Sequence, residues 1–251
     1  MNPDCIFAGA DKRFDLEVLL EHLEKAFDLP TSLVVRVDKT VRDCALLIAY
    51  GVQENGSRRV LGVSVELSEA EVHWRNFLNS LVKRGLCGLT MITSDNHAGL
   101  KAARMSVFPS VPWQRCQFHL QQNASAYVPK KSMQEAVHAD IRNVFNMPSK
   151  EEAERLLSLT VAKYQDQASD LSQWLESDLA EGFTVFEAAP PTARKKLRTT
   201  NMVEFQNKEL KKRTRCIRVF PNKDSLLRVV TALLIELDET WQTETKAYIV
   251  C

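Results

Sequence analysis

Residues 32–67 read SLVVRVDKTVRDCALLIAYGVQENGSRRVLGVSVEL, and this stretch sets the fold class. Three runs rich in Val, Ile and Leu are separated by two turn signals, Asp38-Lys39 and Glu54-Asn55-Gly56. The runs cover 32–37, 44–52 and 60–67. Asn-Gly between apolar runs is a strong hairpin signal. The stretch therefore predicts a three-stranded antiparallel meander.

An amphipathic helix is predicted directly after the meander. Ser68 and Glu71 have the spacing of a capping box, and Gly85 is a candidate C-cap. Between them, apolar residues recur at helical spacing (Trp74, Phe77, Leu78, Leu81 and Val82). We expect this helix to pack on the sheet through that apolar stripe.

Alternating elements follow the helix. A short apolar strand is expected over 88–95, a helix over about 98–107 and a strand near 113–116. Segment 120–190 has helical apolar spacing, and Pro190-Pro191 closes it because neither ring permits a helix to continue. The expected fold class is α/β, with three antiparallel strands, then alternating helices and strands, and an α-helical insertion before the last helices.

The two ends of the chain are expected to be helical. The last two helices are predicted at about 201–214 and 222–241, and the second of these is amphipathic. Near the N-terminus, the segment from about Phe14 to Phe27 has a short helical pattern.

The chain has 251 residues, of which 45% are hydrophobic, so it can bury a core. This length fits one large α/β domain or two small ones, and we interpret it as one domain with an insertion. The expected division is an N-terminal segment, the first part of the core, an acidic helical insertion, and C-terminal helices that complete the core. These parts span 1–31, 32–128, 129–193 and 194–251.

The net charge of +1 hides an uneven arrangement of charges. Segment 132–193 holds eleven acids and four bases, whereas segment 194–218 holds ten bases and two acids. The six cysteines are scattered without paired spacing, as in reduced cytosolic proteins. There is no signal peptide, lipidation motif or apolar run of membrane-spanning length. We therefore expect a soluble cytoplasmic protein with no membrane partner.

Two segments carry the residues that point to chemistry. Residues 94–123 read SDNHAGLKAARMSVFPSVPWQRCQFHLQQN, and residues 198–215 read RTTNMVEFQNKELKKRTR. From about Val35 to Tyr248 the chain resembles mutator-type bacterial insertion-sequence transposases. The resemblance rests on Asp95-x-x-x-Gly99-Leu100, Val111-Pro112 and Gln114-Arg115-Cys116-x-x-His119, taken in this order along the chain.

The resemblance implies a ribonuclease H-like core and an Asp-Asp-Glu carboxylate set. In that family the set binds divalent metal, Mg²⁺ or Mn²⁺, and cuts DNA. Asp95 and Glu204 correspond to the second Asp and to the Glu, so both are expected to be catalytic and metal-binding. From the residues alone, Asp95 could be a cap or turn former at a strand end, and Glu204 an acid favoured by the helix N-terminal dipole.

The first Asp of the set has a weaker counterpart. Asp28 is one residue out of register with the family's first strand, and Pro30 would interrupt that strand's hydrogen-bond ladder. A slip of one residue turns a side chain to the other face of a sheet. Asp28 therefore remains a weak candidate, and a β-bulge would be needed to restore it.

Cys116 and His119 have metal-ligand spacing, but two ligands do not make a zinc site and no second pair supplies the rest. The resemblance implies that the pair lies beside the active site, where the imidazole could orient a carboxylate or a phosphate. The alternative is a buried cysteine with a hydrogen-bonded histidine on a strand edge.

The basic segment around Glu204 is a candidate DNA-binding surface. Its sign is nearly uniform, and clustered Lys and Arg give salt-sensitive affinity for a phosphate backbone. The expected DNA-binding residues are Arg198, Lys208, Lys211, Lys212, Arg213 and Arg215. The alternative is a solvated helical face without a partner.

The leading hypothesis is a transposase that cleaves and transfers DNA strands of an insertion element. Its partners would be the element's terminal repeats and target DNA, with a homo-oligomer on DNA and a nucleoid location. The competing hypothesis is a truncated, catalytically inactive transposase that only binds DNA or a full-length partner. The first Asp, which is out of register, favours inactivity, and the family's long N-terminal DNA-binding region, which has no counterpart here, suggests truncation. A third hypothesis, a ribonuclease acting on RNA–DNA hybrids, would not require the Cys-x-x-His pair or the helical insertion.

Overall fold

A computed structural model describes residues 16–22 and 33–249 of the chain, with the backbone alone described for 16–22. The chain divides into two compact units. The sheet unit comprises Met1–Ile92, Asn96–Val111 and Asn201–Cys251, and the helical unit comprises Thr93–Asp95 and Pro112–Thr200. The chain crosses between the two units several times, and segment 129–193 lies wholly within the helical unit.

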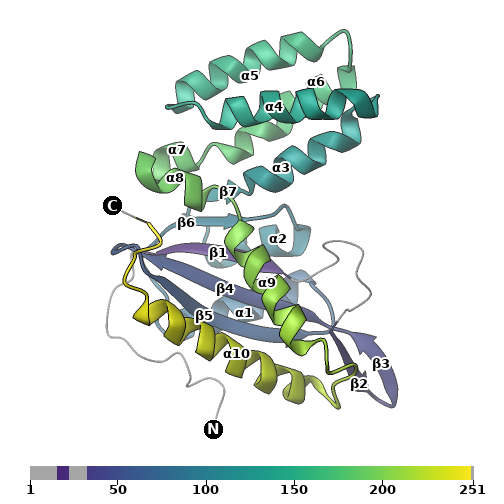
Figure 1. The fold of residues 1–251 in the computed structure, drawn as a ribbon, viewed down its shortest axis with the longest axis vertical. Coiled ribbons are helices and arrows are strands. Elements are labelled where there is room, and N and C mark those ends of the chain that lie inside the picture. The colour runs from purple at the N-terminus through teal and green to yellow at the C-terminus, as the bar shows by residue number, and fades with distance from the viewer. Residues whose placement is uncertain (1–15, 23–32, 250–251) are drawn as a thin grey trace. The chain divides into compact units, whose positions relative to one another are not determined.

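A five-stranded sheet has the order β5-β4-β1-β6-β7 (Figure 1). Its strands are β1 (Leu16–His22), β4 (Ala45–Gln53), β5 (Arg58–Glu66), β6 (Leu89–Ser94) and β7 (Trp113–Arg115). The strands β1, β4 and β5 pair antiparallel. All residues of β4 except Gln53 are buried, as expected for a strand covered on both faces.

The predicted meander is wrong in its first strand. Residues Val34–Val37 form strand β2, which pairs with β3 (Thr40–Asp43) in a separate two-stranded hairpin. Asp38 and Lys39 form its turn, with φ angles of 47° and 66°, the positive values that two-residue hairpin turns require. The other predicted hairpin, at Glu54-Asn55-Gly56, is confirmed between β4 and β5.

The strand that pairs with β4 on the side away from β5 is β1. The predicted helix from Phe14 to Phe27 is therefore also wrong where it overlaps β1. Seven residues of β1, from Leu16 to His22, pair with β4 from Gln53 to Leu47. A central strand position supplies partners for backbone N–H and C=O groups on both sides, and this outweighs a short helical pattern.

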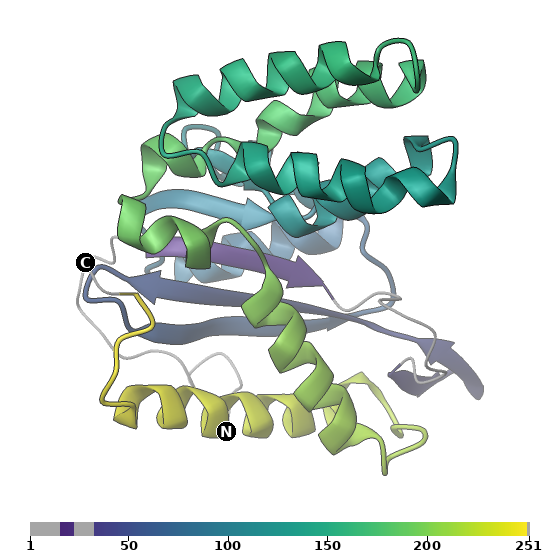
Figure 2. The ribbon, with the colours of Figure 1, turned by 45° about the horizontal axis from the view of Figure 1, so that its top comes forward.

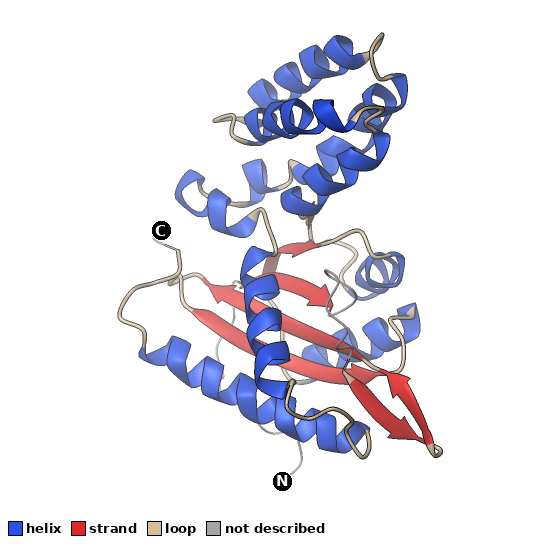
Figure 3. Ribbon diagram, turned by 45° about the vertical axis from the view of Figure 1, so that its right-hand side comes forward, coloured by secondary structure: helices blue, strands red, loops and turns tan. Residues whose placement is uncertain are grey.

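Among the described residues, four helices cover the sheet of this unit. They are α1 (Glu71–Lys83), α2 (Ala98–Val107), α9 (Asn201–Thr214) and α10 (Lys223–Thr243). The helices α9 and α10 lie on one face of the sheet, and α1 and α2 lie on the other (Figures 1 and 3). All four helices occupy the predicted segments to within about two residues.

The ends of α1 follow the prediction in part. Trp74, Phe77, Leu78 and Leu81 are buried, as the apolar stripe predicted. The N-cap is Ala70 without a side-chain hydrogen bond, so the predicted capping box at Ser68 is wrong. Gly85 has φ 100°, and its N–H and that of the next residue donate to the carbonyls of Val82 and Leu81, which is the Schellman pattern of a helix end.

The loop between α9 and α10 is held by the hairpin. The N–H of Arg36 donates to the carbonyl of Phe220 at 2.9 Å, and the N–H of Phe220 donates to the carbonyl of Val34 at 2.9 Å. Val35 and Phe220, which form the parallel bridge, are both buried. The hairpin therefore fixes the connection between the last two helices.

The helical unit has a core of its own. Its longer helices are α3 (Gln117–Ala124), α4 (Gln134–Phe145), α5 (Lys150–Tyr164) and α6 (Ser169–Asp178). Shorter helical segments lie between α3 and α4, at η2 (Ser125–Tyr127) and η3 (Lys131–Met133), and after α6, at η4 (Leu179–Gly182), α7 (Val185–Ala188) and α8 (Pro191–Leu197). The helices α4, α5 and α6 pack side by side (Figure 2) around buried Ile141, Leu171 and Leu175.

Arg115, buried at the end of β7, donates to Asp178 at 2.8 Å and to Glu181 at 2.9 Å, tying strand and helices together.

Within residues 16–22 and 33–249, none of the helices is long and apolar enough to cross a membrane.

Candidate active site

Asp95 directly follows β6, at the strand's carboxyl end, as predicted. Hydrogen bonds to its neighbour Ser94 fix this point of the chain. The indole N–H of Trp113 donates to Ser94 Oγ at 2.9 Å, and the N–H of Cys116 donates to the Ser94 carbonyl at 2.7 Å. Asp95 is half-buried and begins the loop that leads to α2. A carboxylate at such a strand end stands on a rigid support, as functional side chains in α/β sheets do.

Cys116 is the N-cap residue of α3 and is fully buried. Thr200 donates to its sulfur twice, from the backbone N–H at 3.4 Å and from Oγ1 at 3.2 Å. Burial raises the pKa of the Cys116 thiol, and the Thr200 hydrogen bonds only partly oppose this. The protonated thiol thus links the start of α3 to the residue that precedes α9.

His119 lies on α3, one turn after Cys116, rather than on a strand edge. It is half-buried, and its ring meets that of Phe118 edge-on at a centroid distance of 5.6 Å. In the described part of the chain, no group of three or more His, Cys, Asp or Glu side chains is arranged to hold a metal ion.

Glu204 lies in the first turn of α9, where the helix dipole favours an acid. The residue is half-buried, and its Oε1 atom is enclosed. Asn207, one turn further on, is 5% exposed, and its Oδ1 has no hydrogen-bond partner among the described residues. Side chains at i and i+3 lie on the same face of a helix. The first two turns of α9 therefore place two enclosed side-chain oxygens on one face.

Asn207 was not identified as a functional residue from the sequence. The available signal was its position one turn after Glu204, but an isolated Asn in a helix gives no indication of burial. The weak candidate Asp28 lies outside the described residues. Asp95, Cys116 and His119 belong to the helical unit, and Glu204 and Asn207 belong to the sheet unit.

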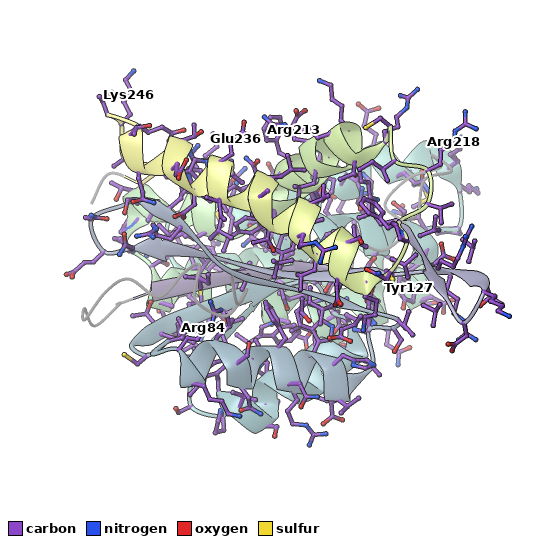
Figure 4. The ribbon with its side chains drawn as sticks, turned by 90° about the horizontal axis from the view of Figure 1, so that it is seen from below. Arg84, Tyr127, Arg213, Arg218, Glu236 and Lys246 are labelled. Carbon is purple, nitrogen blue, oxygen red and sulfur yellow. The ribbon has the colours of Figure 1, made fainter. Side chains whose placement is uncertain are left out.

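The predicted DNA-binding residues differ in their surroundings. Lys208, Lys212 and Arg215 are exposed. Arg213 donates to Glu236 of α10 at 2.8 Å, and Figure 4 shows the two side chains together on the solvent side of the helices. Lys211 is half-buried, and desolvation lowers its pKa.

Arg198 has partners within the helical unit. Its guanidinium donates to the carbonyl of Phe145 at 2.8 Å and to Asn146 Oδ1 at 3.0 Å. Burial lowers its pKa, although an arginine of this kind stays charged. These bonds tie the end of α8 to the end of α4, so a structural role accounts for this side chain.

Comparison with known proteins connects these residues to a family. The profile described as "Transposase, Mutator family" matches residues 26–244. The chain is 52% identical over 209 residues to the "Transposase for insertion sequence element IS406" of Burkholderia multivorans, covering 83% of this chain and 54% of that protein.

Two further relatives are more distant. The identity is 34% over 250 residues to the "Transposase for insertion sequence element ISRM5" of Rhizobium meliloti, covering 96% of this chain and 62% of that protein. It is 32% over 220 residues to the "Transposase for insertion sequence element IS256 in transposon Tn4001" of Staphylococcus aureus, with 86% and 55% covered. The chain thus spans between half and two thirds of the length of these relatives.

The family match begins before β2 and extends past the end of α10, so Asp95, Cys116, His119 and Glu204 all lie within it. Both the profile match and the identity to the relatives extend over most of the chain. The chain therefore belongs to the Mutator family of transposases.

Proposed function

We propose that this chain carries the catalytic core of an insertion-sequence transposase, which cleaves DNA at the element's ends and transfers the strands into target DNA. The observation that carries the proposal is the placement of the two carboxylates found from the sequence. Asp95 stands directly after β6, and Glu204 stands in the first turn of α9. Both positions are fixed by regular structure, as catalytic carboxylates need to be.

The fold we propose for this core is ribonuclease H-like. The sheet order β5-β4-β1-β6-β7 supports it, because three antiparallel strands come first in the chain and the later strands are added on the other side of β1. The division of the chain into an N-terminal segment, a core at 32–128, an insertion at 129–193 and completing helices at 194–251 is part of the same proposal.

The residue types suit a divalent cation of the Mg²⁺ or Mn²⁺ type, which the family resemblance also implies. These ions prefer oxygen ligands and retain some water, so a few carboxylates suffice. Asp95 and Glu204 would supply carboxylate oxygens, and the enclosed Oδ1 of Asn207, which lacks a partner among the described residues, would supply an amide oxygen. When bound, such an ion polarises the scissile phosphate and lowers the pKa of an attacking water.

The protein's own residues have separate tasks in this proposal. Lys208, Lys212 and Arg215 would hold phosphates on either side of the scissile bond, and Lys211 and Arg213 would add to the local positive potential.

The links from Cys116 to Thr200 and to Ser94 would position the Asp95 loop. His119, on the first turns of α3, would orient a carboxylate or a phosphate by hydrogen bonding. A homo-oligomer on DNA and a nucleoid location belong to the same proposal.

Plasmid cleavage tests this function. A plasmid carrying the DNA ends that flank the gene is incubated with the purified chain and Mg²⁺ or Mn²⁺. Asp95→Asn and Glu204→Gln should each reduce nicking by at least about 100-fold, because each removes a charged ligand. Glu209→Gln, on the same helix, is the matched control and should nick like the unmodified chain.

Two results would contradict the proposal. Nicking that persists in both carboxylate variants would mean that another protein or another site cuts the DNA. A folded chain that shifts DNA in a gel and never nicks it would favour the inactive, DNA-binding alternative.

A further inference from the structure

The solvent-facing side of α9 carries a single aromatic ring within a row of polar and basic side chains. Exposed residues recur along the helix at intervals of three and four (Asn201, Phe205, Lys208, Lys212 and Arg215, the last just beyond the helix end). This spacing places them on one face, because an α-helix has 3.6 residues per turn. We call these five residues the α9 stripe.

Phe205 is the most exposed large apolar side chain in the described part of the chain, with 60% of its surface accessible. A single exposed apolar residue is ordinary on a protein surface. Its neighbourhood is unusual, however, because the next exposed positions on the same helical face are Lys208 and Lys212. Along this face of α9, the exposed ring is therefore followed by basic rather than by apolar side chains.

The charge of the α9 stripe is not neutralised by the neighbouring helix. Glu236 of α10 forms its ion pair with Arg213, which lies beside the stripe, at 2.8 Å. Within α9, Lys212 has only a long contact of 4.0 Å to Glu209. A row of cations is complementary to a polyanion, and an aromatic ring among cations adds a surface on which a nucleobase can stack.

The dimensions of the stripe also fit a nucleic acid. Phe205 and Lys208 are three residues apart, which is about 4.5 Å along a helix axis. A ring and an ammonium group at this separation can meet a base and a phosphate of the same strand. A duplex hides the faces of its bases, so such stacking needs a base that is unpaired.

We propose that Phe205 stacks on an unpaired DNA base while Lys208 and Lys212 hold neighbouring phosphates. This inference rests on the proposed function, because it assigns the α9 stripe to the DNA strand that is to be cut beside Glu204. It adds a residue that senses unpaired bases, which neither the carboxylates nor the basic side chains can do.

Fluorescence anisotropy with three labelled DNAs tests the proposal: a short duplex, the same duplex with an internal run of mismatches, and an oligothymidine strand. Phe205→Ala should weaken binding to the mismatched and single-stranded DNAs about tenfold, the order expected for the loss of one base–aromatic stack. Binding to the perfect duplex should change less than about twofold, because charge dominates there. Phe205→Trp should retain the preference.

Two further variants separate stacking from charge and from general surface effects. Lys208→Ala combined with Lys212→Ala should weaken binding to all three DNAs and reduce its salt dependence. Met105→Ala, a change at a 53% exposed apolar residue on α2, should alter none of them. Thermal unfolding should be unchanged in Phe205→Ala, because an exposed ring contributes little to the core.

Three outcomes would overturn the inference. If Phe205→Ala binds all three DNAs like the unmodified chain while the lysine variant is weakened, the stacking role fails and the proposed DNA-binding function stands. If Phe205→Ala leaves DNA binding intact but alters the sedimentation of the protein, the ring belongs to a contact between copies. If the folded unmodified chain binds none of the DNAs, the inference and the proposed function fail together.

Discussion

The helices α9 and α10 lie on the same face of the sheet, yet they bury different kinds of residue. The longer helix, α10, buries mainly Leu226, Val230, Leu234 and Trp241, together with Asp238 and Thr231. The shorter helix, α9, buries three polar side chains (Gln206, Asn207 and Thr214) beside three apolar ones (Met202, Val203 and Leu210). Apolar burial stabilises α10, whereas α9 gives up part of that stabilisation to place polar groups.

The contrast is sharpest between two buried polar residues. Asp238 of α10 accepts hydrogen bonds from the N–H of Val60 at 2.7 Å, from Arg59 Nε at 3.1 Å and from Gln242 at 2.7 Å. Asn207 of α9 has an Oδ1 atom without a partner among the described residues. A buried polar group with all its partners holds a fold together, and one that lacks a partner points to a ligand.

The largest effect is expected at Asp238. Asp238→Ala would leave Arg59 and the Val60 N–H without their buried partner and should lower the free energy of unfolding by about 3 kcal/mol. Urea unfolding followed by circular dichroism measures this loss. Asp224→Ala, in the first turn of the same helix, is the control and should cost well under half as much. A small loss of stability in Asp238→Ala would mean that the hydrogen bonds of Asp238 do not hold the fold together.

The second-largest effect is expected on the rate of DNA cleavage rather than on stability. Glu204→Gln should raise the barrier to DNA cleavage by about 2.7 kcal/mol, equivalent to about 100-fold in rate, with little change in the unfolding midpoint. Glu236→Gln, the matching change on α10, should leave the cleavage rate unchanged. Single-turnover cleavage assays compare the two variants. Equal losses in both would mean that α9 has no special role.

A smaller effect is expected at Asn207. Asn207→Ala should weaken Mn²⁺ binding about tenfold through the loss of one oxygen ligand. The free energy of unfolding should change by less than about 1 kcal/mol, because the Oδ1 that is removed makes no hydrogen bond to the described residues. Electron paramagnetic resonance of Mn²⁺ measures the binding without depending on activity. Unchanged Mn²⁺ affinity together with a large loss of stability would make Asn207 a structural residue.

The smallest effect is expected where the two helices meet at the surface. Arg213→Ala removes an ion pair to Glu236 whose side chains are 48% and 60% exposed, and exposed pairs contribute about 0.5 kcal/mol. Because Glu236 would then be unpaired, the local positive potential and the affinity for DNA should fall slightly. The double variant Arg213→Ala, Glu236→Ala should lose no more stability than either single variant, because each of the three lacks the same ion pair. A loss above about 1.5 kcal/mol would show that this contact orients α9.

The sequence was informative where local pattern and tertiary structure agree. The stripe of Trp74, Phe77, Leu78 and Leu81 predicts α1, and the positions of Asp95 at a strand end and Glu204 at a helix start follow from the apolar runs beside them. These features depend on neighbours within one or two turns of the chain, which is the range that periodicity covers.

The errors come from partners that are distant along the chain. The strand β1 is defined by its pairing with β4, which a seven-residue segment alone cannot indicate. The pairing of β2 with β3 rather than with β4 depends on the turn at Asp38 and on the contact with Phe220. Whether a polar residue such as Asn207 is enclosed depends on the packing of a whole helix, which composition does not report.

The clamp between the β2–β3 hairpin and the loop of Phe220 has a consequence for local unfolding. Because Arg36 donates to the carbonyl of Phe220 and Phe220 donates to the carbonyl of Val34, opening the hairpin also releases the connection between α9 and α10. In a hydrogen-exchange experiment, the amides of Arg36 and Phe220 should therefore lose protection together, before those of the buried strand β4. The first half of the chain would thus govern how rigidly the α9 stripe is presented.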